Sequence, residues 1–112
     1  MAELTELAYH NLIDEAFIAI EEKIDALEEP DIEAESADGI ITLVFENGTK
    51  IILNKQEPLL QLWVATRYNG HHFNYENGQW IDERGAGEFW AFLDAAISKQ
   101  AGVEVRLGLG DA

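Results

Sequence analysis

The sequence predicts an α+β fold in which two helices pack on one face of an antiparallel β-sheet and leave the other face to solvent. Three observations favour this fold: an apolar stripe at helical spacing near the start of the chain, a central run of short alternating segments divided by turn residues, and a second amphipathic stretch near the end. Because 47% of the 112 residues are hydrophobic, residues 1–112 are expected to form a single domain with one core.

The two predicted helices span residues 3–27 and 87–100. In the first, apolar residues recur at steps of three and four and form one stripe: Tyr9, Leu12, Ile13, Ala16, Phe17, Ile20, Ile24 and Leu27. Pro30 follows its end. On the second helix the predicted buried face carries Phe89, Leu93, Ala96 and Ile97. Glu88 lies near its positive N-terminal end, and Gly102 is expected to end it.

Six short segments between the helices are predicted to form the strands of an antiparallel meander. Gly, Asn and Pro residues separate these segments, and Asn47-Gly48 is a strong two-residue hairpin signal because both residues tolerate a positive φ. The expected strands are residues 31–35 at an edge, 40–45, 49–54, 60–66, 71–76 and 79–82.

Alternation along these strands predicts which side chains face the helices and which face solvent. The inward set is Ile41, Leu43, Phe45, Ile51, Leu53, Leu62, Val64 and Phe73. The outward set is Thr42, Lys50, Ile52, Asn54, Gln61, Trp63, His72 and Asn74. Trp63 is therefore expected in water among uncharged polar neighbours, where an exposed aromatic side chain is a candidate anchor for a protein partner. The alternative is that Ile52 or Tyr68 covers Trp63, which then simply packs.

The charge of the chain limits its partners. The formal net charge is −15, and residues 1–46 contain 14 of the 22 acidic residues with Lys23 as their one base. A field this negative repels nucleic acid and anionic lipid and attracts cations and basic proteins, so we expect neither nucleic acid nor membrane as a partner. No cysteine is present, which excludes disulfides and thiolate metal sites. The first ten residues resemble neither a secretory leader nor a transit peptide, which favours the cytoplasm.

Acidic residues form a stripe on the predicted first helix. Asp14, Glu21 and Glu28 are seven residues apart, and Asp25 lies one turn after Glu21, on the face turned away from the core. Glu22, Glu29, Asp31 and Glu33 extend the stripe onto the first strand. Carboxylate oxygens bind hard cations, but the chain has no motif that closes a metal site, so any site here should be open and weak. The alternative is a solvated acidic face that keeps the protein soluble.

The histidines and hydroxyls carry less information. His10 and Asp14 are one helical turn apart, and they either share a metal or form a surface hydrogen bond, of which the hydrogen bond is the commoner outcome. His71 and His72 point to opposite faces of their strand and cannot act as a pair. No Ser, His and Asp stand at the spacing of a catalytic motif.

Several segments resemble one protein family. The run Asn54–Ala65, NKQEPLLQLWVA, is similar to the signature stretch of the frataxin family, and Glu46–Lys50, ENGTK, resembles its bacterial branch. Weaker matches are Ile20–Asp25, His72-Phe73, Trp80-Ile81, Phe89-Trp90 and Gln100–Gly102, so the resemblance covers roughly residues 9–102. It implies the α-β sandwich predicted above.

The resemblance also implies a function in iron–sulfur cluster assembly. In that family the matching ridge binds iron and contacts the cysteine desulfurase; the matching acids here are Glu21, Glu22, Asp25, Glu28, Asp31 and Glu33. Because oxygen ligands on an open surface discriminate poorly, we expect the iron to bind weakly and other divalent cations to compete. Ala26 and Asn74 depart from the family pattern, which leaves the metal stoichiometry open. The expected protein is a cytoplasmic bacterial regulator or iron donor that docks on the desulfurase and the scaffold protein, as a monomer or a metal-dependent oligomer.

The expected partner surface comprises Trp63, Asn54, Gln61 and Lys55. Two other functions stay open. One is an enzyme that oxidises ferrous iron on the same carboxylates, as ferroxidases and iron-storage proteins do, and the other is a purely protein-binding acidic module.

Overall fold

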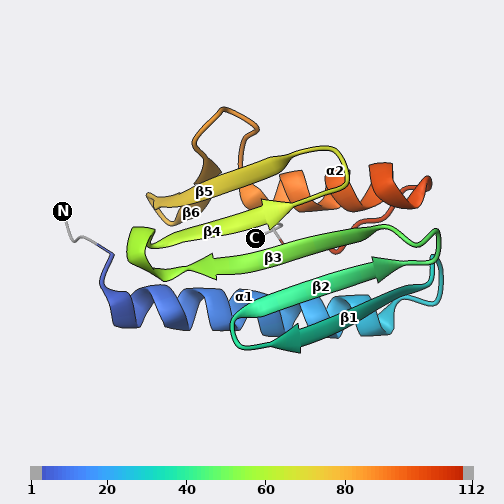
Figure 1. Ribbon diagram of the computed structural model, residues 1–112, viewed down its shortest axis with the longest axis horizontal. Helices are drawn as coiled ribbons and strands as arrows, with labels where there is room; N and C mark the ends of the chain where they lie inside the picture. The colour runs from blue at the N-terminus through green and yellow to red at the C-terminus, as the bar shows by residue number, and fades with distance from the viewer. Residues whose placement is uncertain (1–3, 110–112) are drawn as a thin grey trace.

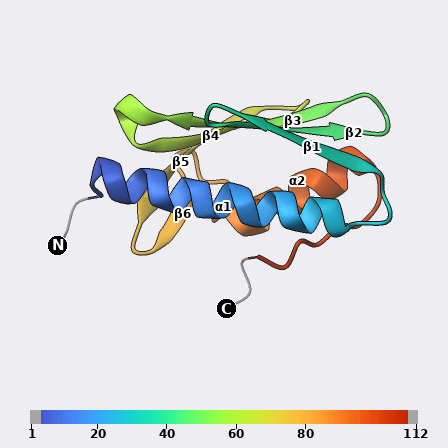
Figure 2. The same cartoon turned by 90° about the horizontal axis from the view of Figure 1, so that it is seen from below.

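The computed structural model describes residues 4–109 and has two layers (Figure 1). A six-stranded antiparallel sheet forms one layer. Helices α1, Glu6–Ala26, and α2, Phe89–Ala101, form the other. Figure 2 shows both helices on the same side of the sheet, with the opposite side open. The α+β prediction is therefore confirmed. Neither helix of the described part of the chain is long and apolar enough to cross a membrane.

The strands follow one another in chain order across the sheet, so every connection joins neighbours. They are β1 (Ile32–Ala37), β2 (Ile40–Phe45), β3 (Lys50–Gln56), β4 (Gln61–Ala65), β5 (Gly70–Glu76) and β6 (Gln79–Asp82), with a 3₁₀ turn, η1 (Glu57–Leu59), between β3 and β4. All five pairings are antiparallel, as expected for a meander.

Capping residues set the start of both helices and the end of α2. The Thr5 hydroxyl accepts a hydrogen bond of 3.1 Å from the Ala8 N–H, so α1 begins at Glu6 rather than at the expected Glu3, which lies outside the described residues. The carboxylate of Glu88 accepts hydrogen bonds from the N–H groups of Trp90 and Ala91 in the first turn of α2, and Gly102 ends that helix at φ 80°. Since α1 ends at Ala26, Glu28 follows the helix instead of continuing its stripe.

The core lies between the sheet and the helices. Every residue predicted to face inward is at most 3% exposed: Ile41, Leu43, Phe45, Ile51, Leu53, Leu62, Val64 and Phe73. The apolar stripe of α1 packs against these residues from the helix layer. The Tyr9 hydroxyl donates a 2.6 Å hydrogen bond to the Gln61 carbonyl oxygen. This bond ties the first turns of α1 to the start of β4, and burial raises the pKa of Tyr9 to about 12.

The first, third, fourth and fifth strands differ from the prediction by one or two residues at their ends, and backbone conformation explains two of these differences. Asp38 and Gly39 adopt φ of 49° and 80°, which forms a tight turn, so β1 pairs with β2 as far as Ala37 rather than ending at Glu35. Leu60 was expected to begin the fourth strand, but its φ of 51° ends η1, and β4 starts at Gln61. A left-handed leucine carries no sequence signal, because glycine and asparagine are the usual residues there.

The segment after α2 completes the core, which the sequence analysis did not predict. Val105 and Leu107 are each 4% exposed. The Ser98 hydroxyl accepts a hydrogen bond from the Val105 N–H and donates one to its carbonyl oxygen, at 2.8 and 2.9 Å, and Asp94 accepts from the Leu107 N–H. These bonds hold the segment against α2, on the side of the helices away from the sheet (Figure 2).

Candidate functional site

Six acidic residues that we call the acidic ridge lie at the C-terminal end of α1 and along the start of β1. Of these residues Glu22, Asp25, Glu28, Asp31 and Glu33 are exposed and Glu21 is half-buried. Glu33 pairs with Val44, whose neighbours Leu43 and Phe45 are buried, so the Glu33 side chain points to the open face of the sheet. The ridge therefore bends around the edge strand, from the helix layer to the open face.

The ridge is a dispersed set of charges. Within residues 4–109, one group of three potential metal ligands has its donor atoms within 4.8 Å of one another. That group does not include any residue of the ridge. One ridge acid does line a hollow: a shallow depression of about 340 Å³ between α1 and the β1–β2 turn is bordered by Glu21, Asp14 and Asp38. This arrangement suits a hydrated cation held by charge, as expected for an open site without a closing ligand.

Asp14 of the acidic stripe forms an ion pair with Lys55. The Lys55 ammonium lies 2.7 Å from an Asp14 carboxylate oxygen and 3.1 Å from Nδ1 of His10. His10 and Asp14, expected to share a metal or a hydrogen bond, thus both contact this one lysine. Lys55 is paired with the buried Leu62, so its side chain is on the helix side of the sheet and is 18% exposed. The structure therefore separates Lys55 from the open face on which the other predicted partner residues lie.

Trp63 lies on the open face but is half-buried rather than held in water. Its ring stacks on His72 of the neighbouring strand, with centroids 4.1 Å apart and planes 13° from parallel. Its indole N–H donates a 2.7 Å hydrogen bond to Oε1 of Gln61. The expected exposure was wrong because alternation identifies the face of a side chain but not its cross-strand neighbour. Ile52 and Asn54 border a hollow of about 160 Å³ beside the ring.

Gln61 orients Trp63 from a buried position. It was expected on the exposed surface, but it is 8% exposed. Its side-chain amide donates to Asn74 and Glu83, at 3.0 Å each, while its oxygen accepts from Trp63. Glu83 was missed by the sequence analysis because it follows the last strand. The result is a fixed polar network that presents one face of the tryptophan.

His71 and His72 point to opposite faces, as predicted. The His71 ring lies 4.4 Å from the Phe92 ring of α2, and its Nδ1 lies 3.5 Å from a carboxylate oxygen of Asp82. Burial pushes the pKa of Asp82 upward, but hydrogen bonds from the N–H groups of Ala86 and Arg84, with His71, outweigh it and leave that pKa below its usual value. This pair supports the β5–β6 end of the fold.

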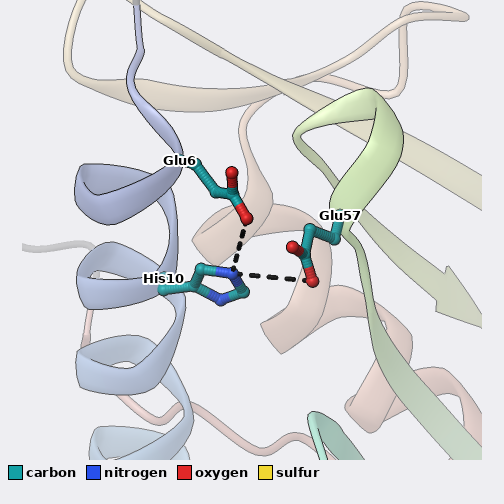
Figure 3. Close-up of side chains that lie close together, drawn as sticks. All are labelled: Glu6, His10 and Glu57. Carbon is teal, nitrogen blue, oxygen red and sulfur yellow. Dashed lines mark ion pairs between the residues drawn. The ribbon is translucent and has the colours of Figure 1, made fainter.

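The three potential ligands that lie together are Glu6 and His10 of α1 and Glu57 of η1 (Figure 3). Nε2 of His10 lies 4.0 Å from a Glu6 oxygen and 3.6 Å from a Glu57 oxygen. Glu6 and His10 are one helical turn apart and visible as a pair in the sequence, whereas Glu57 comes from a distant segment and was not predicted.

Comparisons with known proteins agree with this architecture. Residues 2–103 match the family model described as a frataxin-like domain. A protein of Pseudoalteromonas atlantica named iron-sulfur cluster assembly protein CyaY is 58% identical over 91% of this chain and 94% of its own length. A protein of the same name from Tolumonas auensis is 50% identical over 89% and 95%.

Solved structures show the same fold. Frataxin from Psychromonas ingrahamii, of the CyaY family, has a TM-score of 0.82 at 44% identity and covers 92% of this chain and 97% of its own. Trimeric frataxin from Saccharomyces cerevisiae, complexed with ferrous, has a TM-score of 0.65 at 24% identity over 91% and 90%, which is a likeness of fold alone. With one family model matching nearly the whole chain and close relatives of one name, this chain belongs to the frataxin family and is similar to its bacterial CyaY branch.

Proposed function

We propose that this protein acts in iron–sulfur cluster assembly in the bacterial cytoplasm. The observation that carries this proposal is the 58% identity, over 91% of the chain, to a protein named for that process. Identity of this extent covers both the acidic ridge and the open face of the sheet. The single core formed by both helices and the sheet also supports treating residues 1–112 as one domain.

The ridge acids Glu21, Glu22, Asp25, Glu28, Asp31 and Glu33 bind iron in this proposal. Their exposure and dispersed arrangement favour weak binding with competition from Ca²⁺ and Mn²⁺, because oxygen ligands on an open surface discriminate poorly among hard cations. The test is Fe²⁺ addition under anaerobic conditions, followed by NMR. Line broadening within residues 14–35 that disappears in a Glu21→Gln, Glu22→Gln and Asp25→Asn variant is the expected result. Broadening centred on His71 and His72 would reject the ridge as the iron site.

The same acids provide the surface for a basic partner, which we propose to be the cysteine desulfurase. The supporting observation is the charge of −15, of which residues 1–46 carry nearly all, since charges at an exposed rim act by steering association. Charge reversal at Glu21, Glu22 and Asp25 should slow association and flatten its salt dependence. Stopped-flow kinetics with the purified desulfurase measure both, and reversal of the distant exposed Glu76 is the matched control.

The open face provides a second contact, which we assign to the scaffold protein. Trp63 and His72 form a stacked aromatic surface, and Asn54 borders the hollow beside it. Gln61 orients the Trp63 ring by accepting the hydrogen bond from its indole N–H. Trp63→Ala should speed dissociation of a complex containing the scaffold, at a cost of about 2 kcal/mol or more, and leave iron binding unchanged. Trp63→Phe keeps a stacking ring and should lose less. Unchanged dissociation with a folded Trp63→Ala variant would make Trp63 a packing residue.

Lys55 was expected in that surface, but its ammonium is engaged by Asp14 and His10 on the other side of the sheet. We therefore assign it no partner contact in the present proposal.

The monomeric state proposed for the free protein is tested by analytical ultracentrifugation with and without Fe²⁺.

A further inference from the structure

The cluster of Glu6, His10 and Glu57 differs in kind from the ridge. Figure 3 shows two carboxylates from different segments, α1 and η1, directed at the same edge of one imidazole ring. The donor atoms of all three residues lie within 4.8 Å of one another. The cluster contains a nitrogen ligand, and it lies at the opposite end of α1 from the ridge, about 22 Å away for fifteen residues at 1.5 Å rise.

Neighbouring contacts hold these three residues in place. The Tyr9 hydroxyl, next to His10, is bonded to the Gln61 carbonyl oxygen at 2.6 Å, which fixes the first turns of α1 against the η1–β4 junction. The η1 turn is closed by the Leu60 N–H, which donates to the Glu57 carbonyl oxygen at 3.0 Å. Glu57 and His10 thus face each other because two elements of regular structure are bonded together, and not through chance contact of loose side chains.

The orientation of the His10 ring is set by Lys55. An ammonium group can only donate, so Nδ1, 3.1 Å from the Lys55 Nζ, is an acceptor and the neutral ring carries its proton on Nε2. Nε2 is the atom directed at the two carboxylates. The lysine therefore fixes the ring so that Nε2 points towards both carboxylates, and a metal ion that binds there must displace the Nε2 proton.

The two carboxylates also repel each other. Their oxygens lie within 4.8 Å of each other, and a cation bound between them relieves this repulsion.

We propose that Glu6, His10 and Glu57 bind one divalent transition-metal ion such as Zn²⁺, Co²⁺ or Fe²⁺, with water completing its coordination. Imidazole with carboxylates suits these ions, whereas Mg²⁺ and Ca²⁺ prefer oxygen alone. Ligands about 2.0–2.2 Å from a tetrahedral ion are about 3.4 Å apart, so the observed 3.6 and 4.0 Å require only small side-chain rotations of exposed carboxylates. This inference does not depend on the proposed function.

Binding has a consequence for Lys55. When the ion takes Nε2, that atom releases its proton to solvent and Nδ1 takes one up, so Lys55 loses its acceptor on His10 and keeps its ion pair with Asp14. The ion thereby joins α1 to the β3–β4 connection.

The test uses the full chain and titration calorimetry with Zn²⁺, in buffer that contains excess Mg²⁺. One Zn²⁺ should bind, and His10→Gln should weaken it at least tenfold, since one of three ligands is lost. His72→Gln is the matched control, because His72 also lies beside a carboxylate, Glu83 at 3.7 Å, but beside one only. Glu6→Gln and Glu15→Gln form a second pair on the same helix, with Glu15 exposed and outside the cluster.

Co²⁺ supplies a readout beyond affinity. Paramagnetic shifts should appear on the His10 ring protons and on the Lys55 side chain, and they should persist in the ridge variant with Glu21, Glu22 and Asp25 neutralised. Persistence there separates this site from the ridge, so each proposal can fail without the other. If His10→Gln does not fold by circular dichroism, Glu57→Gln replaces it. Unchanged Zn²⁺ affinity in the folded variant, or Co²⁺ shifts centred on His71 and His72, would overturn the proposal.

Discussion

The two ends of α1 carry carboxylates in different arrangements. At the C-terminal end the ridge spreads six acids over a helix, a connection and an edge strand, and all but Glu21 are exposed. At the N-terminal end Glu6, His10 and Glu57 gather within 4.8 Å. The C-terminal end has more acidic residues, but only the N-terminal end brings its side chains close enough together to bind one ion. Density of charge therefore predicts attraction of cations, whereas coordination requires residues brought together by the fold.

The largest effect that distinguishes the two ends is expected from Lys55→Met. The methionine keeps most of the side-chain volume but removes the cation between Asp14 and His10. We expect a loss of about 1–2 kcal/mol in the free energy of unfolding, below the value for a buried charged hydrogen bond because Asp14 is 58% exposed. Urea denaturation measures it, and Lys50→Met, at an exposed lysine, is the control. Equal stability of the two variants would mean that the N-terminal end is as loosely built as the ridge.

The ridge should respond with the opposite sign. Neutralising Glu21, Glu22 and Asp25 removes like charges at helical spacings, each worth a few tenths of a kcal/mol. The free energy of unfolding should therefore rise by about 0.5–1 kcal/mol at low salt and not at 1 M NaCl, where charges are screened over about 3 Å. Thermal denaturation at both salt concentrations tests this, with Glu76→Gln as a control on a distant hairpin. A rise that survives 1 M salt would point to a cause other than charge.

The smallest effect concerns one proton. Glu57→Gln removes the carboxylate that raises the pKa of Glu6, so that pKa should fall towards 4.5. A carboxyl group whose pKa is higher in the folded than in the unfolded protein stabilises the fold at pH values below the unfolded-state pKa. This stabilisation is lost as the pH rises through the folded-state pKa. Carbon-detected NMR titration of the Glu6 carboxyl group measures the change, and Glu22→Gln should leave it alone. A Glu6 titration identical in Glu57→Gln would mean that Glu57 is not the group that raises the pKa of Glu6.

Hydrophobic alternation was sufficient to predict most of the fold. The inward residues of the central strands were all identified, because a residue such as Leu62 or Phe73 must be buried on one face of a half-exposed sheet. Boundaries set by conformation rather than composition were missed, as at Leu60. Val105 was missed for a different reason: its hydrogen bonds to Ser98 hold a segment after α2 that has no periodic pattern.

The candidate sites were predictable only where they are local in sequence. The ridge is a run of acids that can be read directly, although Glu28 proved to follow the helix. Trp63 was placed on the correct face, but its partner His72 comes from another strand. Glu57 reaches His10 only because the strand pairing of β3 and β4 carries η1 to the start of α1. Such long-range contacts depend on how the strands pair, which the alternation within one strand does not reveal.

The buried residues Val105 and Leu107 lie beyond residues 2–103, the part of the chain that matches the family model. They cover the side of the helices that faces away from the sheet. This side is far from the open face of the sheet, and neither residue belongs to the ridge. Substitution of Val105 or Leu107 is therefore expected to change heat tolerance while the proposed binding surfaces keep their shape. The stability of this fold can in that case be adjusted at its C-terminal segment without altering the surfaces proposed for metal and partner recognition.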